Sequence, residues 1–181
     1  LDIADRLWFG PKGARILTVG SMKAVKNHPL LLRAFARLER PDARLMFVGD
    51  GTGREALLSL ARDLGVVDQV IFAGFQLDPT PFYETADLFV LSSNYEGFGN
   101  VIVEALATGT PVASTDCPSG PAEILENGKW GRLSPVGDAD ALAKAMRASL
   151  EDYHDTAALK RRAADFAPEI AAHKYLKLLD L

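Results

Sequence analysis

The stretch that decides the fold is Asn94-Tyr-Glu-Gly-Phe-Gly-Asn-Val-Ile-Val-Glu-Ala105, which follows the apolar run Ala86-Asp-Leu-Phe-Val-Leu91. The apolar run predicts a buried strand, and the segment after it has helical apolar spacing. The stretch therefore lies where a strand passes into a helix, which is where α/β folds bind ligands. Its two glycines permit a tight loop, so Glu96 can fold back over the start of the helix that carries Glu104. Both carboxylates could then face one crevice.

Composition narrows the classes of protein that the chain can belong to. With 181 residues, 48% of them hydrophobic, the chain can bury one core and is expected to be soluble and globular. Its net charge of −4 argues against a general nucleic-acid surface, which needs clustered Lys and Arg. The single cysteine, Cys117, excludes an internal disulfide. No apolar run approaches the roughly 20 residues that span a bilayer. The chain starts at Leu1 without a methionine, which suggests a piece of a longer protein.

Short β-rich runs alternate with segments of helical spacing along the chain. We predict strands at Arg15–Gly20, Arg44–Gly49, Gln69–Gly74, Leu88–Leu91, Gly109–Ser114 and Gly131–Leu133. Helices are predicted from Pro29 to before Pro41, from the capping box Thr52–Glu55 to about Leu64, and at Phe82–Thr85, Pro121–Glu126, Asp138–Leu150, Thr156–Phe166 and Glu169–Leu179. Residues 1–13 are expected to be a lead-in and loop. This alternation predicts an α/β fold, a Rossmann-like doubly wound parallel sheet of about six strands with C-terminal helices. We expect a Rossmann-like domain over residues 1–150 and a C-terminal helical extension over 151–181 that packs back on this domain or on a preceding part of a longer protein.

Three motifs do not support the binding functions that their patterns first suggest. Gly49-Asp-Gly-Thr-Gly53 fails the dinucleotide fingerprint because Arg54 stands where the third glycine belongs, so a turn that lines another nucleotide's pocket is preferred. Asp138-Ala-Asp140 resembles an acidic metal-binding motif, but its place at the head of an amphipathic helix favours a cap. His28 could cap the helix that follows it, whereas His154 and His173 are expected to be solvated. No cluster of His, Cys or carboxylates has metal-ligand spacing, and we predict no metal site.

The central stretch and the loop after the first strand together suggest an anion site. Gly99, Asn100 and Val101 would present free main-chain amides at a helix start. Lys23 and Lys26 lie at the carboxyl edge of the sheet and could complete a phosphate cradle. The two glutamates cannot bind phosphate, but carboxylates are suited to accept hydrogen bonds from sugar hydroxyls.

At this point the residues resemble a known family. The segment Glu96-Gly-Phe-Gly-x4-Glu104-Ala105 is similar to the E-x7-E signature of retaining, nucleotide-sugar-dependent glycosyltransferases of family 4, which have the GT-B fold. Further landmarks occur in the same order: Val19-Gly20 with Lys26-Asn27, Phe47-Val-Gly-Asp-Gly51, Val70-x-Phe-x-Gly74, Ala86-Asp87, Ser92-x3-Glu96, Gly109-x-Pro-Val112 and Glu123-Ile-x3-Gly128-x2-Gly131. The resemblance covers about Arg15 to Ala148 and implies the C-terminal, donor-binding half of such an enzyme, without the N-terminal acceptor-binding half.

The resemblance implies a role for each candidate residue. Glu96 and Lys26 would be catalytic, with Glu96 beside the donor sugar hydroxyls and Lys26 facing the diphosphate. Glu104 would hold the ribose hydroxyls. Ser21 stands where the family commonly has an arginine, and Lys23 could substitute for it. The remaining donor-binding candidates are Gly99, Asn100 and Val101 at the diphosphate, Gly20 in the loop after the first strand, and the backbone of Gly49, Asp50, Phe75 and Gln76 at the base.

The expected activity is retaining transfer of a hexosyl unit by front-side attack, with no metal or other cofactor and a nucleotide sugar as donor. The loop Asp116–Glu123 resembles that of bacterial family members that build surface polysaccharides. This resemblance weakly favours a UDP-hexose or UDP-N-acetylhexosamine as the donor. A glycan or lipid-linked acceptor is expected, in the cytoplasm or at the inner face of the membrane, and the chain alone should be inactive. Two alternatives stay open: another GT-B enzyme, such as a disaccharide phosphorylase or a nucleotide-sugar epimerase, and a non-catalytic nucleotide-binding module.

Overall fold

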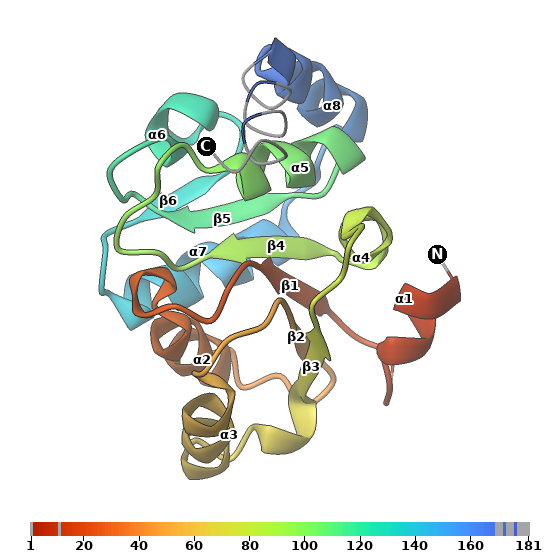
Figure 1. The fold of residues 1–181 in the computed structure, drawn as a ribbon, viewed down its shortest axis with the longest axis vertical. Helices are drawn as coiled ribbons and strands as arrows, with labels where there is room; N and C mark the ends of the chain where they lie inside the picture. The colour runs from red at the N-terminus through yellow and green to blue at the C-terminus, as the bar shows by residue number, and fades with distance from the viewer. Residues whose placement is uncertain (1, 11, 169–171, 173–175, 177–181) are drawn as a thin grey trace.

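The computed structural model describes residues 2–10, 12–168, 172 and 176, and across them one six-stranded sheet forms the centre of the molecule (Figure 1). The strands are β1 (Arg15–Val19), β2 (Arg44–Val48), β3 (Val70–Gly74), β4 (Leu88–Leu91), β5 (Val112–Thr115) and β6 (Arg132–Ser134). All five pairings are parallel, in the order β3-β2-β1-β4-β5-β6. The predicted doubly wound parallel sheet is therefore confirmed.

Helices cover both faces of this sheet, as the continuously apolar strands require. They are α1 (Asp2–Leu7), α2 (His28–Ala36), α3 (Arg54–Asp63), α4 (Thr80–Thr85), α5 (Asn100–Thr108), α6 (Pro121–Ile124), α7 (Ala139–Glu151) and α8 (Thr156–Ala164), with short 3-10 turns at Ala24–Lys26, Val67–Gln69 and Glu126–Gly128. In Figure 1, α2, α3 and α7 lie on one face, and α5, α6 and α8 lie on the other.

The alternation of side chains along each strand divides the core into two layers. In β4, Leu88 and Val90 join the cluster under α2, α3 and α7, whereas Phe89 and Leu91 join the cluster under α4, α5 and α8. These four side chains are at most 2% exposed. Because β4 is buried on both faces, its position is fixed from both sides, and so is the loop that leaves its carboxyl end.

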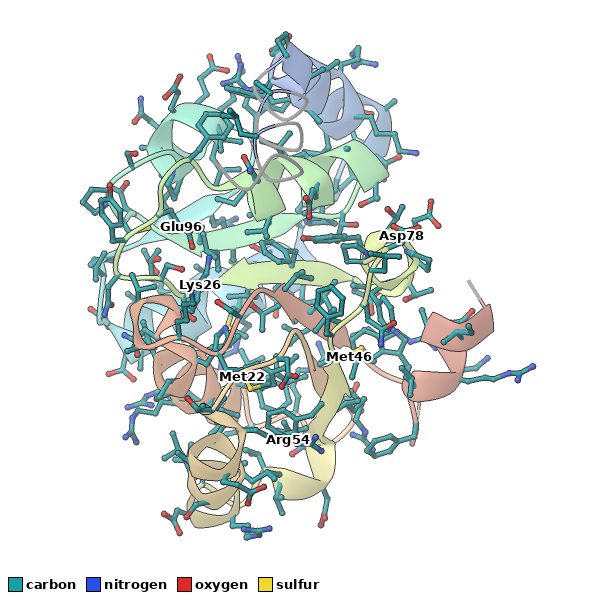
Figure 2. The ribbon with its side chains drawn as sticks, viewed as in Figure 1. Met22, Lys26, Met46, Arg54, Asp78 and Glu96 are labelled. Atoms are coloured by element: carbon teal, nitrogen blue, oxygen red, sulfur yellow. The ribbon has the colours of Figure 1, made fainter. Side chains whose placement is uncertain are left out.

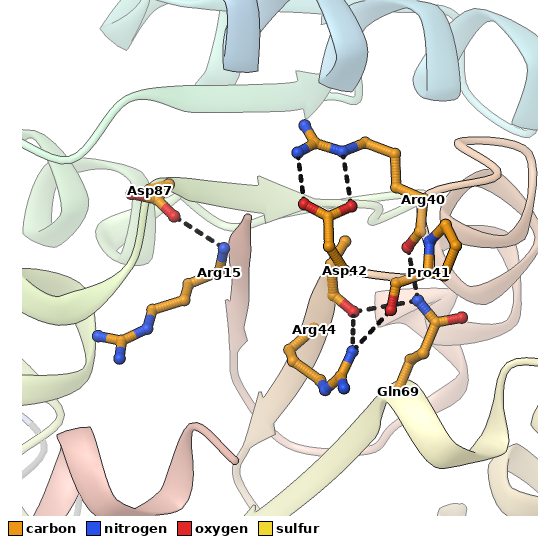
Figure 3. Close-up of polar contacts among 8 residues, drawn as sticks. Arg15, Arg40, Pro41, Asp42, Arg44, Gln69 and Asp87 are labelled. Atoms are coloured by element: carbon orange, nitrogen blue, oxygen red, sulfur yellow. Dashed lines mark hydrogen bonds and ion pairs between the residues drawn. The ribbon is translucent and has the colours of Figure 1, made fainter. Parts of the chain in front are cut away.

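A polar network closes the opposite, amino edge of the sheet (Figure 3). The buried Arg44 guanidinium donates to three main-chain carbonyls, those of Phe9, Pro41 and Ala43, at 3.1, 3.0 and 2.8 Å. Gln69 Nε2 donates to the carbonyls of Arg40 and Ala43 at 2.7 and 3.0 Å. Asp87 accepts a hydrogen bond from the main-chain amide of Arg15 at 2.8 Å. These contacts fix the turns at the amino edge of the sheet.

Four predictions about local structure need correction. Residues 2–7 form α1 rather than a loop, and α1 packs against α4. The capping box at Thr52 does not form, because α3 begins at Arg54 after Gly53 without a side-chain cap. Asn27, not His28, caps α2, by accepting a hydrogen bond from the amide of Leu30.

The fourth correction concerns His154, which is half-buried rather than solvated, with its Nε2 2.7 Å from the carbonyl of Ser149. The predicted cap at Asp138 is confirmed, since its carboxylate accepts from the amide of Ala141 at 2.8 Å. The predicted helix Glu169–Leu179 lies mostly outside the described residues, as does His173.

His28 should make the stability of the domain depend on pH. Its ring is 5% exposed, at the start of α2 and edge-to-face against Phe47. Burial, and then the charge of Lys26, lower its pKa from 6.5 to about 4. The folded state therefore resists protonation, so the stability contribution is complete above pH 6.5 and is lost as pH falls from 6.5 towards 4, by about 3 kcal/mol.

Urea unfolding of the wild type and of His28→Leu at several pH values between 7.5 and 4 measures this contribution. The variant should lose the part of the pH dependence that lies between 6.5 and 4, while the carboxylates still contribute to both curves. Parallel curves for the two proteins would contradict the assignment.

Candidate functional site

The candidate site lies at the switch point of the sheet, between β1 and β4, where the chain connections diverge to opposite sides. The loop that follows β1 and the loop that follows β4 meet there. The amide of Asn94 donates to the carbonyl of Val25 at 2.9 Å, and Asn27 Nδ2 donates to Asn94 Oδ1 at 3.0 Å. Two loops that are 66 or more residues apart in sequence are thus joined above the sheet.

An ion pair between Lys26 and Glu96 stands at the centre of this junction. Lys26 Nζ lies 2.6 Å from Glu96 Oε1, and the two side chains point toward each other (Figure 2). Their side chains are 17% and 10% exposed, so the pair is largely removed from water. Ser93 Oγ donates to the same oxygen, Oε1, at 2.6 Å. The site thus holds a carboxylate and an ammonium group in contact, largely shielded from water.

The main chain around Glu96 is also fixed. Its amide donates to the carbonyl of Pro118 at 2.8 Å, and its carbonyl accepts from the amide of Ser119 at 2.9 Å. Next to this contact, a β-carbon on Gly120 would lie 1.7 Å from the carbonyl oxygen of Phe98, so only glycine fits there. The loops after β4 and β5 therefore behave as one unit, which holds Glu96 at the carboxyl edge.

The start of α5 presents main-chain donors to the same edge. Gly99 adopts a left-handed conformation, with φ of 91°, and no side chain of the described residues caps the helix after it. The amides of Asn100 and Val101 are in the first turn, where a helix offers its own amides no internal acceptor. An uncapped helix N-terminus of this length can bind an anion. The predicted location of these amides at a helix start is confirmed.

The ends of β1 and β2 approach each other without side chains between them. A β-carbon on Gly49, whose φ is +143°, would lie 2.0 Å from the carbonyl oxygen of Gly20. The Lys26 side chain passes 3.4 Å from the position of a β-carbon on Gly20. Asp50 accepts a hydrogen bond on its carbonyl from Met22 at 3.0 Å. The glycines therefore let the loops after β1 and β2 come into close main-chain contact at the carboxyl edge.

The other predicted site residues lie in the loops that follow β3 and β1. Phe75, after β3, is 70% exposed, and Gln76 Nε2 donates to the carbonyl of Ala73 at 2.9 Å. Ser21 is partly buried and Lys23 is exposed. Cys117 is buried, and burial raises the pKa of its thiol.

Glu104 is positioned from a different element. The buried Tyr83 hydroxyl, in α4, donates to Glu104 Oε2 at 3.0 Å. Burial first, and then the charge of Glu104, raise the pKa of Tyr83 well above its usual value. Tyr83 is therefore a neutral donor that fixes the Glu104 carboxylate, and Glu104 and Glu96 have different supporting partners.

The sequence interpretation missed the residues that hold the two carboxylates, namely Ser93 and Tyr83. Ser92 and Ser93 follow β4 directly and are 1% and 0% exposed. Two hydroxyl residues immediately after an apolar strand are the sequence signal that could have identified Ser93. Tyr83 had no signal, since its spacing in α4 fits an ordinary core position. The roles of all the predicted residues toward a ligand stay predictions.

Across the described ranges, no three His, Cys, Asp or Glu side chains lie together as a possible metal site. Among the same residues, no helix combines the length and apolar character that crossing a membrane requires. Asp140, the second aspartate of the acidic motif, forms an ion pair with Arg37 instead.

A doubly wound sheet with a lysine and an uncapped helix N-terminus at its switch point defines the class of α/β domains that hold a nucleotide or its phosphates there. The model of the family described as "Glycosyl transferases group 1" matches residues 5–166. The chain belongs to this family of glycosyltransferases, as the resemblance in the sequence predicted.

Individual relatives agree with this assignment. The lipopolysaccharide core biosynthesis glycosyltransferase LpsE of Rhizobium meliloti is 38% identical over 169 residues, which cover 91% of this chain and 49% of LpsE. The N-acetylgalactosamine-N,N'-diacetylbacillosaminyl-diphospho-undecaprenol 4-alpha-N-acetylgalactosaminyltransferase of Campylobacter jejuni is 34% identical, over 82% of this chain and 40% of that enzyme.

Among solved structures, Anabaena Alr3699/HepE in complex with UDP superposes with a TM-score of 0.77 at 26% identity, over 94% of this chain and 50% of that chain. The 181-residue chain thus spans about half the length of the relatives it matches or less.

Tyr83→Phe tests the support of Glu104. Removing the hydroxyl takes away a hydrogen bond to a charged group and should lower the free energy of unfolding by about 1.5 to 3 kcal/mol. Chemical denaturation measures the change. Tyr153→Phe, at a 92% exposed tyrosine, is the matched control and should have no measurable effect. Equal losses in the two variants would contradict the role assigned to the Tyr83 hydroxyl.

Proposed function

We propose that this chain is the donor-binding domain of a retaining glycosyltransferase that moves a hexosyl unit from a nucleotide diphosphate sugar to a glycan or lipid-linked acceptor. The observation that carries the proposal is the Lys26–Glu96 ion pair, in which Glu96 belongs to the loop that leads directly into the uncapped start of α5. The family supports the reaction class, and the UDP complex of a solved relative supports the kind of donor.

The diphosphate is the part of the donor that this geometry suits best. As the bond to the sugar breaks, negative charge develops on the leaving diphosphate, and a lysine with preorganised amides stabilises that charge. Lys26 and the amides of Asn100 and Val101 supply both kinds of group from elements that the core fixes. We therefore propose transfer that needs no metal ion, with Glu96 binding hydroxyls of the transferred sugar.

The nucleoside is assigned to the other side of the same helix start. Glu104, oriented by Tyr83, would accept hydrogen bonds from the ribose hydroxyls. The main chain at Gly49 and Asp50 and at Phe75 and Gln76 would line the base. A UDP-sugar is our favoured donor.

The remaining partners of the whole protein are also proposals. Relatives named for lipopolysaccharide core synthesis and for a diphospho-undecaprenol substrate support a glycan or lipid-linked acceptor. We propose that the full-length protein is cytoplasmic, either free or peripherally associated with the inner face of the membrane. An N-terminal acceptor-binding domain would complete the catalytic cleft.

Calorimetry with UDP, GDP and ADP tests the nucleotide site directly. We expect weak binding of one nucleoside diphosphate and no turnover of a nucleotide sugar by this chain alone. Glu104→Ala should weaken the binding of that nucleotide about tenfold, because it removes a charged acceptor for the ribose. Glu96→Ala should not weaken it, because Glu96 is assigned to the sugar.

Glu151→Ala is the matched control, since it removes the same charge from the exposed end of α7. Its affinity for the nucleotide should equal that of the wild type. Absence of binding at millimolar nucleotide would refute the proposed site, and a larger loss for Glu96→Ala than for Glu104→Ala would reverse the two assigned roles.

A further inference from the structure

The ion pair at the centre of the site creates a competition that the proposed function must resolve. In this structure Lys26 Nζ is bound to Glu96 Oε1 at 2.6 Å. The proposed function requires the same ammonium group to face the diphosphate of the donor. A diphosphate offers several anionic oxygens to a lysine, against the single carboxylate of Glu96.

Two neighbouring serines hold the two partners of the ion pair separately. Ser92 Oγ donates to the main-chain carbonyl of Lys26 at 2.9 Å, whereas Ser93 Oγ donates to the carboxylate of Glu96 at 2.6 Å. Consecutive residues of an extended segment point in opposite directions, so one serine can serve each partner. Thr115 Oγ1, at the end of β5, donates to the carbonyl of Ser93 at 2.6 Å and fixes the pair of serines.

The contacts of Lys26 and of Glu96 differ in whether they leave the charged group free to move. Ser92 fixes only the main chain of Lys26, and the lysine stem lies over Gly20, where no β-carbon obstructs it. Glu96 is held at its amide, its carbonyl and its carboxylate. If the ion pair opens, the ammonium group can therefore move, while the carboxylate keeps its place.

We propose that Lys26 passes from Glu96 to the diphosphate when the donor binds, and that Ser93 is the positioning residue that keeps Glu96 in place after the exchange. The inference rests on the proposed function and adds a step to it. In the free protein Glu96 holds Lys26 away from the diphosphate. The apparent affinity for the donor is then lower than the intrinsic affinity, because only the molecules in which the ion pair is open can bind the diphosphate through Lys26.

Replacing Glu96 by glutamine should therefore tighten the binding of UDP, although it removes a residue assigned to the site. Glutamine keeps an oxygen that can accept from Ser93 but no longer holds the ammonium group by charge. We expect Glu96→Gln to bind UDP about threefold to tenfold more tightly than the wild type. Asp116→Asn, which removes an exposed carboxylate after β5, is the matched control and should change the affinity for UDP by less than about twofold.

Loss of a negative charge could also tighten binding through its general field, and a second background separates the two effects. In Lys26→Met, which keeps the length of the stem, Glu96→Gln should give no gain, since there is no lysine to release. A double-mutant cycle by calorimetry of UDP measures this coupling. Thermal unfolding of each variant shows that it is folded.

The outcomes separate the inference from the function on which it rests. If Glu96→Gln tightens UDP binding in the wild-type background but not in the Lys26→Met background, the exchange is supported. An equal gain in both backgrounds, or no gain in either, overturns it while the nucleotide site stands. If the wild type and all variants fail to bind UDP, GDP and ADP, the proposed function fails, and the exchange fails with it.

Ser93 has its own measurement, in the full-length enzyme. Ser93→Ala should lower kcat about tenfold and leave the affinity of this chain for UDP within about twofold, because Ser93 acts only on the carboxylate assigned to the sugar. Ser59→Ala removes the hydroxyl of an exposed serine in α3 and should retain kcat. An unchanged kcat in Ser93→Ala, or an equal loss in both variants, overturns the positioning role.

Discussion

The parallel pairing of β1 with β4 is the constraint on which the rest of the molecule depends. Three strand-helix-strand connections separate the two strands in sequence, yet Ile16 and Leu17 lie beside Leu88 and Phe89. Because both strands are buried on both faces, the loops that follow them have fixed starting points. The meeting of Lys26 and Glu96 follows from that register: a shift of β4 by one residue would exchange its core faces and turn the serine pair around.

Polar groups are buried at this junction, and contacts among them offset the free-energy cost of removing them from water. An ammonium group and a carboxylate that are largely removed from water are stable only when they are paired and hydrogen-bonded. Here the pair shares one carboxylate oxygen with a serine hydroxyl, and main-chain contacts to the next loop hold the segment. Such an arrangement favours a single geometry over maximal stability, which suits the proposed recognition of hydroxyl and phosphate groups in fixed positions.

Most of the fold could be predicted from the sequence because it follows from apolar periodicity and from glycines at strand ends. The positions of the strands along the chain and the start of α5 after Gly99 were correct for that reason. Local errors arose where tertiary contacts outweigh capping patterns: Asn27 is held by Asn94 and so caps α2 in place of His28. The support of Glu104 by Tyr83 could not be predicted, since it joins α4 to α5 and leaves no periodic signature. The ion pair of Lys26 with Glu96 could not be predicted either, because only the fold of the two loops brings these distant residues together.

The position of α4 has a mechanical consequence for the site. This six-residue helix is attached at one side to the segment after α1, through the indole of Trp8 and the hydroxyl of Thr85, at 2.9 Å. Two residues earlier, Tyr83 reaches across to Glu104. This short helix thus connects the segment after α1 with the Glu104 carboxylate of α5. Displacement of that segment would tilt the helix and shift the tyrosine with it, so a force applied near Trp8 can reach Glu104 without passing through the sheet.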